Sequence, residues 1–314
     1  MKKCQILYYI ALVSLLTGCQ PRCSNEVVCE TYVHRYGVPL DPQDWSERGQ
    51  HGQVISTRKD GVVVSKTYEA GVLNGEVTYT FPHRDVIARR CFYSNGHLDQ
   101  ETYCYSNGMP HKQISYDDAQ ENVLCWYESG APQLKETYIN GLLIQGEYFD
   151  LSQQRESSVL DQNGLRTLRD DYGELLSVDE IEHGQLVLRR TYHSNGAPEA
   201  VTPYSNGVIE GKRWTYQPGG EPATLEEWNN NFQHGNTEVF ENGEKIADRP
   251  YVYGKIHGVE RCYREGGNLV QENHWTQGEK HGRCHNYFNG ERRTDWYFKN
   301  RLVNRGTYEA LCNQ

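Results

Sequence analysis

Histidine is the residue type in this chain whose spacing most resembles a chemical site. His51, His183, His234, His257 and His281 each precede a glycine, and the last three recur at intervals of 23 and 24 residues. Recurring imidazoles could bind zinc, whose histidine ligands lie about 2.0–2.1 Å from one ion. If each interval is one hairpin, equivalent residues lie two strands, or about 9.6 Å, apart. We therefore expect these histidines to pack against turns, and we predict neither a metal site nor a cofactor.

Ten cysteines could form disulfides or hold a metal, but none has the spacing of a CxxC site. Beyond residue 19, an even number remains for an oxidising compartment: Cys23, Cys29, Cys91, Cys104, Cys125, Cys262, Cys284 and Cys312. Cys23 and Cys29 are the pair that we expect to be bonded. A Cys262–Cys284 bond is not expected, because residues one repeat apart exceed the roughly 7 Å Cα separation that a disulfide allows.

Aromatic side chains recur with nearly the same period as the histidines. Tyr204, Trp228, Tyr251, Trp275 and Phe298 are separated by 24, 23, 24 and 23 residues. In one interpretation, the rings cover the thin core of a single-layer sheet, where tyrosine keeps its hydroxyl group in water. In the other, they form a platform for a partner protein or glycan, because Tyr and Trp are enriched in binding hot spots. Both can hold on opposite faces, so we take these five residues as candidate binding residues.

Known catalytic motifs are absent from the sequence. It has no Gly-x-Ser-x-Gly elbow, no phosphate-binding glycine-rich loop and no His-Glu-x-x-His. Acidic residues are numerous, yet no pair is distinguished as an acid and a base. We therefore predict a protein without catalytic residues and without a small-molecule substrate.

β-Hairpins are the elements that must position these residues. Turn signals such as Asn195-Gly196 and Asn206-Gly207 separate runs of alternating aromatic and polar residues, which is the pattern of hairpins. Two turns per repeat of about 23 residues correspond to one hairpin per repeat. The stretch 145–183 is the least regular. We expect turns near residues 49, 61, 71, 84, 96, 108, 119, 130, 141, 153, 164, 173, 184, 196, 207, 220, 231, 243, 254, 267, 278, 290 and 301.

The predicted fold is all-β, with eleven to twelve hairpin repeats over residues 45–314 that form an elongated, twisted, single-layer antiparallel sheet. Residues 19–44 are expected to be a cysteine-containing tether, and any helix should lie within residues 23–44. A second series of glycines keeps the same period: Gly211, Gly235, Gly258, Gly282 and Gly306.

Composition agrees with an elongated fold. The 314 residues are 37% hydrophobic, the mean hydropathy is −0.80, and 23 residues are tyrosine. A compact enzyme of this length would need more apolar side chains. Disorder is disfavoured because 11% of the residues are aromatic.

Net charge argues against two classes of partner. The formal charge is −10, and it becomes −12 when the first 18 residues, with Lys2 and Lys3, are removed. Nucleic-acid binding requires a basic surface. Charge-driven adhesion to anionic lipid requires one too, so neither is expected.

The N-terminus has the pattern of a secretory signal, with Lys2 and Lys3 followed by an apolar stretch too short to span a bilayer. It ends in Leu16-Thr17-Gly18-Cys19, which resembles the lipobox of bacterial lipoproteins. The resemblance implies cleavage after residue 18 and lipid attachment at Cys19. Gln20 then resembles the outer-membrane sorting choice of Gram-negative bacteria, so we expect a lipid anchor in the cell envelope, in the outer membrane.

The repeats resemble bacterial variants of the MORN repeat, which has an aromatic-x-x-Gly-x-x-His-Gly core. Matching segments are Tyr68-Glu-Ala-Gly71-Val-Leu-Asn-Gly75, Tyr204-Ser-Asn-Gly207-Val-Ile-Glu-Gly211, Tyr251-Val-Tyr-Gly254-Lys-Ile-His257-Gly258 and Trp275-Thr-Gln-Gly278-Glu-Lys-His281-Gly282. Bacterial proteins of this kind are commonly grouped with YwqK-type antitoxin or immunity proteins. The resemblance covers roughly residues 45–310 and implies a hairpin fold.

Three functions are compatible with these features. The first is a lipid-anchored envelope protein that acts as a protein-binding module or scaffold. The second is an immunity lipoprotein, or antitoxin, that neutralises a toxin by direct binding. The third is a structural envelope protein linked by disulfides through its spare cysteines.

Overall fold

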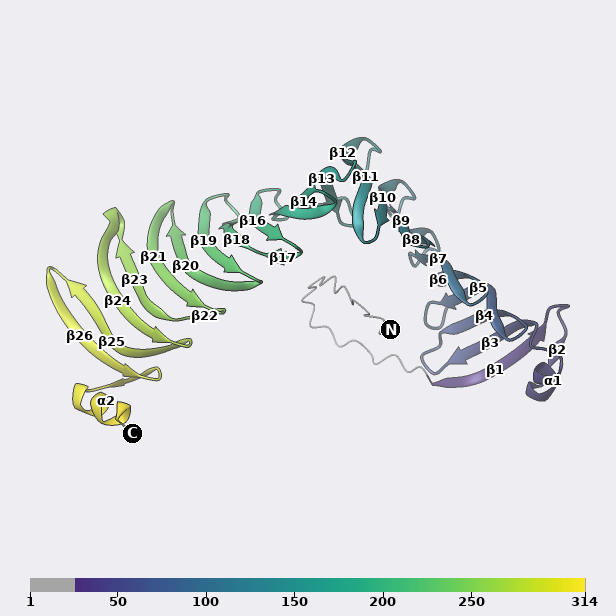
Figure 1. Ribbon diagram of the computed structural model, residues 1–314, viewed down its shortest axis with the longest axis horizontal. Coiled ribbons are helices and arrows are strands. Elements are labelled where there is room, and N and C mark those ends of the chain that lie inside the picture. Colours follow the sequence, from purple (N-terminus) through teal and green to yellow (C-terminus); the bar gives the residue numbers. More distant parts are fainter. Residues whose placement is uncertain (1–25, 314) are drawn as a thin grey trace, which may run out of the picture.

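The computed structural model describes residues 26–313 and confirms the predicted fold class. The described chain forms one open antiparallel sheet of 27 strands in hairpin succession, with 67% strand and 6% helix. Figure 1 shows the ribbon bent into an arch, with its first and last strands both on the lower side. Cys19 and Cys23 lie outside the described residues.

The strands of the first half are β1 (Val27–His34), β2 (Pro39–Leu40), β3 (Gly52–Arg58), β4 (Val63–Glu69), β5 (Val72–Thr80), β6 (Ile87–Ser94), β7 (His97–Cys104), β8 (Pro110–Asp117), β9 (Gln120–Trp126), β10 (Pro132–Ile139), β11 (Leu142–Phe149), β12 (Arg155–Leu160) and β13 (Asn163–Arg169). Those of the second half are β14 (Leu175–Glu182), β15 (Gln185–Tyr192), β16 (Pro198–Ser205), β17 (Val208–Ile209), β18 (Gly211–Tyr216), β19 (Pro222–Asn229), β20 (Phe232–Glu241), β21 (Glu244–Val252), β22 (Lys255–Ile256), β23 (Gly258–Arg264), β24 (Asn268–Thr276), β25 (Glu279–Phe288), β26 (Glu291–Phe298) and β27 (Arg301–Val303).

The sheet begins earlier than the turn spacing predicts. Strand β1 lies within the segment expected to be a tether, yet it pairs along its length with β3, placing Thr31 opposite Ile55. Helix α1 (Pro42–Glu47) follows, and the Asp41 side chain caps it by accepting the Asp44 N–H at 2.7 Å. Its Trp45 is buried. The N-terminal end of the ribbon is therefore folded from β1 onwards.

A helix at the C-terminus differs from the sequence prediction. Helix α2 (Arg305–Cys312) begins at Asn304, whose side chain accepts the Thr307 N–H at 2.8 Å. Gly306 therefore lies in a helix, and its place in the 24-residue glycine series is a coincidence of spacing. The ring centroids of Tyr308 on α2 and Trp296 on β26 are 5.0 Å apart, so α2 covers the last hairpin as a cap. A short 3-10 turn (Glu265–Gly267) also lies beyond the expected 23–44, and α1 itself extends past that range to Glu47.

The turns alternate between two edges of the ribbon, and nearly all lie where the sequence predicts them. The exception in the middle is the turn expected near 164, which occurs at Asp161 and Gln162, while Gly164 lies within β13. We call one edge the linked edge, with turns at 48–50, 70–71, 95–96, 118–119, 140–141, 161–162, 183–184, 206–207, 230–231, 253–254, 277–278 and 299–300. The other is the open edge, with turns at 60–61, 82–86, 106–108, 128–130, 151–153, 171–173, 194–196, 218–220, 242–243, 265–267 and 289–290.

Successive turns on the linked edge are joined by backbone hydrogen bonds. Examples are the Gly254 N–H to the Gln233 carbonyl at 2.8 Å and the Gly278 N–H to the Ile256 carbonyl at 2.9 Å. Most described contacts between open-edge turns instead use longer side chains, as where the Tyr127 hydroxyl donates to the Phe149 carbonyl. The direct backbone bond holds hairpins closer together than a side-chain bridge does. In the C-terminal half, β17 and β22 follow linked-edge turns and lie on the inner side of the arch (Figure 1), so this difference explains the curvature.

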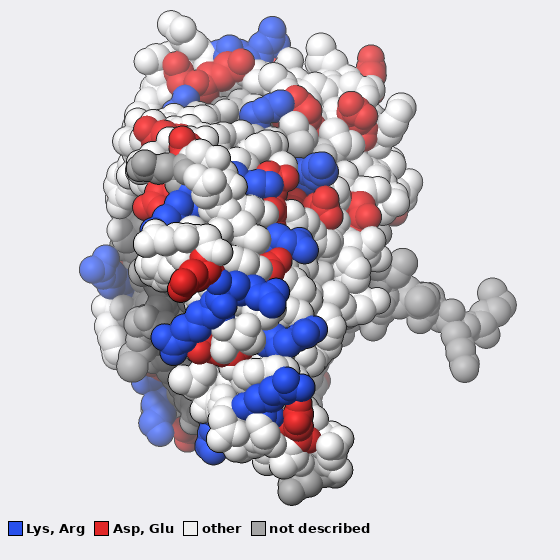
Figure 2. Space-filling model, turned by 90° about the vertical axis from the view of Figure 1, so that its left-hand side faces the viewer, with Lys and Arg blue, Asp and Glu red and all other residues white. Residues whose placement is uncertain are grey.

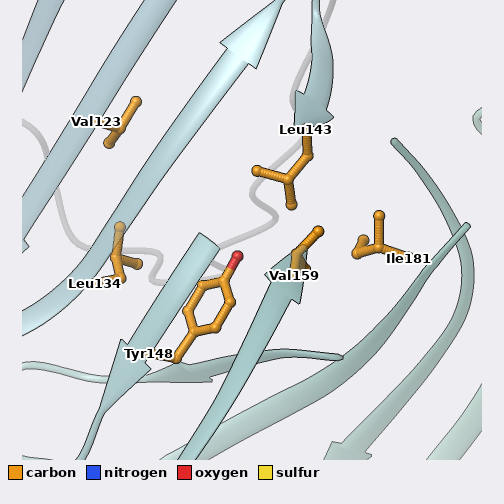
Figure 3. Packing of buried hydrophobic residues seen from close by; sticks show 6 residues of the cluster. All are labelled: Val123, Leu134, Leu143, Tyr148, Val159 and Ile181. Carbon is orange, nitrogen blue, oxygen red and sulfur yellow. The ribbon is translucent and has the colours of Figure 1, made fainter. Parts of the chain in front are cut away.

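The largest apolar core lies at a bend in the ribbon, within strands β9–β14, which we call the corner. It is formed by Val123, Leu134, Leu143, Tyr148, Val159 and Ile181. Figure 3 shows these side chains gathered from several strands of the corner. The sheet coils back here, which brings Gln133 beside residues more than 35 positions later. The Gln133 side chain donates to the carbonyl oxygens of Arg169 and Asp170. The corner contains most of the stretch 145–183, which explains why its repeat pattern is the least regular.

Candidate binding surface

The five aromatic residues proposed from the sequence all lie in the second half of the ribbon and are half-buried. Three of them face a glycine on the neighbouring strand: Trp228 pairs with Gly211, Tyr251 with Gly235 and Trp275 with Gly258. Tyr204 and Phe298 instead lie beside turns and pair with Ile209 and Arg301. The space beside these glycines is bordered by other side chains, since a Cβ at Gly211 would meet Pro203 and one at Gly258 would meet Pro250. The cross-strand pairing of rings with glycines explains why the two series share one period.

Polar contacts cover these rings. The indole N–H of Trp228 donates to Glu226 at 2.8 Å, and that of Trp275 donates to Glu260 at 3.0 Å. Cationic groups lie over four of the five rings, among them Arg213 over Trp228 at 5.8 Å. These indole groups and ring faces therefore already have partners within the sheet. This favours the first interpretation, in which the rings cover the thin core of the sheet.

A recurring cluster of polar side chains accompanies the aromatic residues. In each case a largely buried carboxylate binds an arginine from another strand, which is the adjacent strand for all of them except Glu136. Most also accept a hydrogen bond from an aromatic hydroxyl or indole group. The carboxylates are Glu101, Glu136, Asp179, Glu226 and Glu260. Burying a charge is costly unless it is paired and hydrogen-bonded, and these carboxylates are both. The clusters therefore let polar side chains occupy buried positions in a chain that has few apolar residues.

The cluster at Glu136 is buried and includes Tyr148 of the apolar core. Its carboxylate accepts hydrogen bonds from Arg166 at 2.6 Å, Tyr138 at 2.8 Å and Tyr148 at 2.9 Å. Burial raises the pKa of Glu136, but the charge and hydrogen bonds of Arg166 outweigh it, so the pKa lies below its usual range. Burial is the first cause of a raised pKa at Tyr148. Glu136 is therefore ionised and Tyr148 neutral at physiological pH.

Two of the histidines that precede glycine bind neighbouring turns. The His51 Nδ1 accepts the Ala70 N–H at 3.2 Å, and the His257 Nδ1 accepts the Gln277 N–H at 3.4 Å. His234 and His281 contact aromatic rings instead. Over residues 26–313, no group of three His, Cys, Asp or Glu side chains could hold a metal ion.

The cysteines of the described chain differ in accessibility. Cys91 and Cys284 are buried, whereas Cys29 on β1 and Cys312 on α2 are exposed. Burial raises the pKa of the Cys125 thiol to about 11. The exposed pair lies at the two ends of the ribbon. Cys23, the predicted partner of Cys29, lies outside the described residues.

An exposed aromatic group on the linked edge was missed from the sequence. Tyr253 is 69% exposed and Phe232 is 51% exposed. Their ring centroids are 6.1 Å apart in an edge-on arrangement, and the exposed His234 ring lies 5.1 Å from Tyr253. Tyr253 occupies the first position of a tight turn with φ of 47°, where Asn230 stands in the neighbouring linked-edge turn. A bulky residue with positive φ is uncommon, so a tyrosine at the turn position that Asn206 occupies before Gly207 is the sequence signal that could have identified the group.

Comparison with known proteins gives no assignment. No protein-family model matches the chain, and no curated protein matches it. Among solved structures, a porin-like protein from Bacteroides uniformis is similar over 84% of this chain and 92% of its own, with 10% identity and a TM-score of 0.16. BamB from Moraxella catarrhalis is similar over 79% of this chain and 82% of its own, with 11% identity and a TM-score of 0.17. A mutant of TarM from S. aureus has 12% identity and a TM-score of 0.18; the match covers 40% of this chain and 19% of TarM. These TM-scores are too low to support an argument.

Proposed function

We propose that this protein is a lipid-anchored repeat protein of the cell envelope, in the outer membrane, that acts as a protein-binding module or scaffold. The sequence Leu16-Thr17-Gly18-Cys19 supports the anchor. The exposed group of Phe232, His234 and Tyr253 is the observation that carries the binding role. Among residues 26–313, no helix is long and apolar enough to cross a membrane.

The group has the chemical features of a protein-binding hot spot. Aromatic residues dominate such hot spots because a partner can bury a large rigid ring at small entropic cost. Here the two rings already contact each other, so their arrangement is set before a partner binds. Tyr253 also adopts a backbone conformation in which Asn or Gly would be less strained. Retaining the ring there despite that cost favours a role for it outside the hairpin.

Crosslinking in intact envelopes tests this role, using Tyr253→Asn. Asparagine suits the positive φ of the turn, so the variant removes the ring without disturbing the hairpin. We expect the partner recovered with the wild-type protein to fall at least about tenfold, since hot-spot truncations cost about 2 kcal/mol or more. The matched control is Tyr172→Asn, which removes a 79% exposed ring from an open-edge turn. Equal recovery of the same partner with all three proteins would exclude the group as its binding site.

A second candidate function is supported by the two exposed cysteines. Cys29 and Cys312 lie at opposite ends of the ribbon, where they could link copies end to end as a structural envelope protein if Cys29 bonds to another copy instead of to Cys23. Non-reducing electrophoresis of envelope fractions tests this. We expect a ladder of multimers that is lost in Cys29→Ser and in Cys312→Ser and retained in Cys104→Ser. A monomer under both reducing and non-reducing conditions would reject the structural role.

A further inference from the structure

Charge is distributed unevenly along the ribbon. Residues 280–314 carry seven Lys and Arg and three Asp and Glu, whereas residues 26–279 carry 22 and 39. The C-terminal end is therefore positive in a chain whose formal charge is −10. Figure 2 views this end of the molecule and shows Lys and Arg side chains gathered over its lower half. The net charge of the whole chain argued against adhesion to anionic lipid, but it does not reflect the positive charge of this end.

Four basic side chains at this end are exposed and have no carboxylate partner in the described chain. They are Arg283 on β25, Arg292 on β26, and Lys299 and Arg301 beside the last linked-edge turn. We call these four residues the basic end. Arg293 and Arg305 are exposed too, but they pair with Asp295 and Glu309. Unpaired charges at the surface are those available to an external anion.

The basic end is a broad surface. Arg292 lies near the start of β26 and Lys299 just after its end, so the two are separated by about 24 Å of extended strand. Charged residues on an edge strand also prevent it from pairing with another chain, which would account for Arg292. Arg283 lies on the inner strand β25 and Arg301 lies beside a turn, so edge protection does not explain them. A flat array of phosphate groups fits such a surface better than one bound anion.

The shape of the arch places both ends of the described ribbon on one side. Strand β1 and helix α2 both lie on the lower side of the arch in Figure 1. Cys19 precedes Val27 by eight residues, which span at most about 28 Å when fully extended. An anchor at Cys19 would therefore hold β1 close to the bilayer and turn the C-terminal end towards the same surface.

We propose that the basic end binds the anionic phospholipid headgroups of the bilayer that carries the lipid anchor, so that the arch stands on the membrane at both ends. The orientation rests on the proposed anchor, whereas binding of headgroups by the basic end can be measured without it. Each basic residue near an anionic surface strengthens binding by about fivefold. Salt should weaken this binding, because the Debye length is about 10 Å at 0.1 M ionic strength.

Vesicle cosedimentation tests the proposal with residues 19–314 carrying Cys19→Ala, which contains every described residue and cannot be acylated. The vesicles are phosphatidylcholine alone or phosphatidylcholine mixed with phosphatidylglycerol. One variant carries Arg283→Gln, Arg292→Gln and Arg301→Gln. The matched control carries Arg84→Gln, Lys212→Gln and Lys255→Gln, an equal loss of charge from exposed sites elsewhere. Circular dichroism melting confirms that both variants fold.

We expect binding only to vesicles that contain phosphatidylglycerol, with loss at high salt and a reduction of about 100-fold in the basic-end variant. The control variant should bind like the parent chain, and added inorganic phosphate should not displace the vesicles. Equal effects of the two triple substitutions, or equal binding to both kinds of vesicle, would overturn the proposal. Binding to polyglutamate but not to vesicles would overturn it too, in favour of an acidic protein. Because this chain has no acyl group, failure of the anchor would leave the result unchanged.

Discussion

Arg166 on β13 binds Glu136 on β10 at 2.6 Å across two intervening strands. In a flat sheet these strands would lie about 14 Å apart, so the contact exists only because the sheet coils at the corner. Arg166 also lies 3.8 Å from Asp179 on β14. One guanidinium group therefore joins strands that the hairpin pattern alone would keep apart.

Removing this guanidinium group should destabilise the corner strongly. We expect Arg166→Met to lower the free energy of unfolding by about 3–5 kcal/mol, because it leaves the buried Glu136 carboxylate without its counter-charge. Arg155→Met is the control, because Arg155 forms a more exposed ion pair with Glu147 at 3.4 Å, and its change should stay within about 1 kcal/mol. Urea unfolding followed by circular dichroism measures both. Similar midpoints for the two variants would show that the corner does not depend on this pair.

Stability should fall in acid. Burial raises the pKa of Glu101, but hydrogen bonds from Tyr116 and Arg89 outweigh it, and the pKa lies below its usual range. The pKa of Glu136 is lowered too. Such carboxylates contribute stability above the unfolded value of about 4.3, and this contribution is lost as pH falls further, through their folded pKa. Thermal midpoints should therefore decline below about pH 4.3, and less steeply in Glu101→Gln. An identical acid decline in that variant would contradict the assignment.

The glycines opposite aromatic residues should not tolerate a side chain. Gly258 has φ of +114°, and a Cβ there would lie 3.1 Å from Pro250. We expect Gly258→Ala to cost about 1–3 kcal/mol, since L-residues rarely adopt this conformation. Gly306→Ala is the opposite control, because Gly306 lies in α2 without a positive φ; it should stabilise the helix by about 0.5–1 kcal/mol. Denaturant titration would refute the prediction if both changes had the same sign.

Thiol labelling should distinguish the ends of the ribbon from its interior. Cys312 is exposed and should react within the native protein, and the exposed Cys29 should do so once its predicted bond to Cys23 is reduced, whereas Cys91 and Cys284 should react only on unfolding. Burial raises the pKa of Cys91, which further reduces its thiolate fraction. Mass spectrometry of labelled peptides measures each site. Early labelling of Cys91 would contradict its burial, and labelling of Cys29 only after reduction would support the predicted Cys23–Cys29 bond.

The lipid anchor makes a prediction in cells. Cys19→Ala removes the acylated thiol, and the protein should move from the membrane pellet to the soluble envelope fraction. Cys29→Ala is the matched control and should stay with the membrane. Retention of the Cys19 variant in the pellet after a high-salt wash would mean that another attachment dominates.

Local signals in the sequence were sufficient to predict the hairpins. Asn206-Gly207 and Tyr253-Gly254 both form two-residue turns at the expected places, because such turns need positive φ that only a few residue types adopt at little cost. Contacts set by curvature were not predictable in this way. Arg166 and Glu136 lie 30 residues apart, and nothing in their spacing shows that the sheet coils.

The candidate binding residues show the same limit. The period of Trp228 and Trp275 placed both correctly on the ribbon, but period alone does not reveal that Glu226 and Glu260 bind their indole groups. The exposed Tyr253 broke the pattern of its turn instead of following it. Helix α2 was missed because Gly306 fell on the expected interval, while the capping residue Asn304 was the contrary signal.

The open edge gives the molecule a place to accept new sequence. Its turns already differ in length, from two residues at 289–290 to five at 82–86, whereas the linked edge keeps two-residue turns along nearly all of the ribbon. A loop inserted on the open edge would leave the backbone bonds between linked-edge turns intact, and lengthening a surface loop costs little entropy. A fluorescent tag or epitope inserted between Asn242 and Gly243 should therefore be accepted, whereas one inserted between Tyr253 and Gly254 should break the arch.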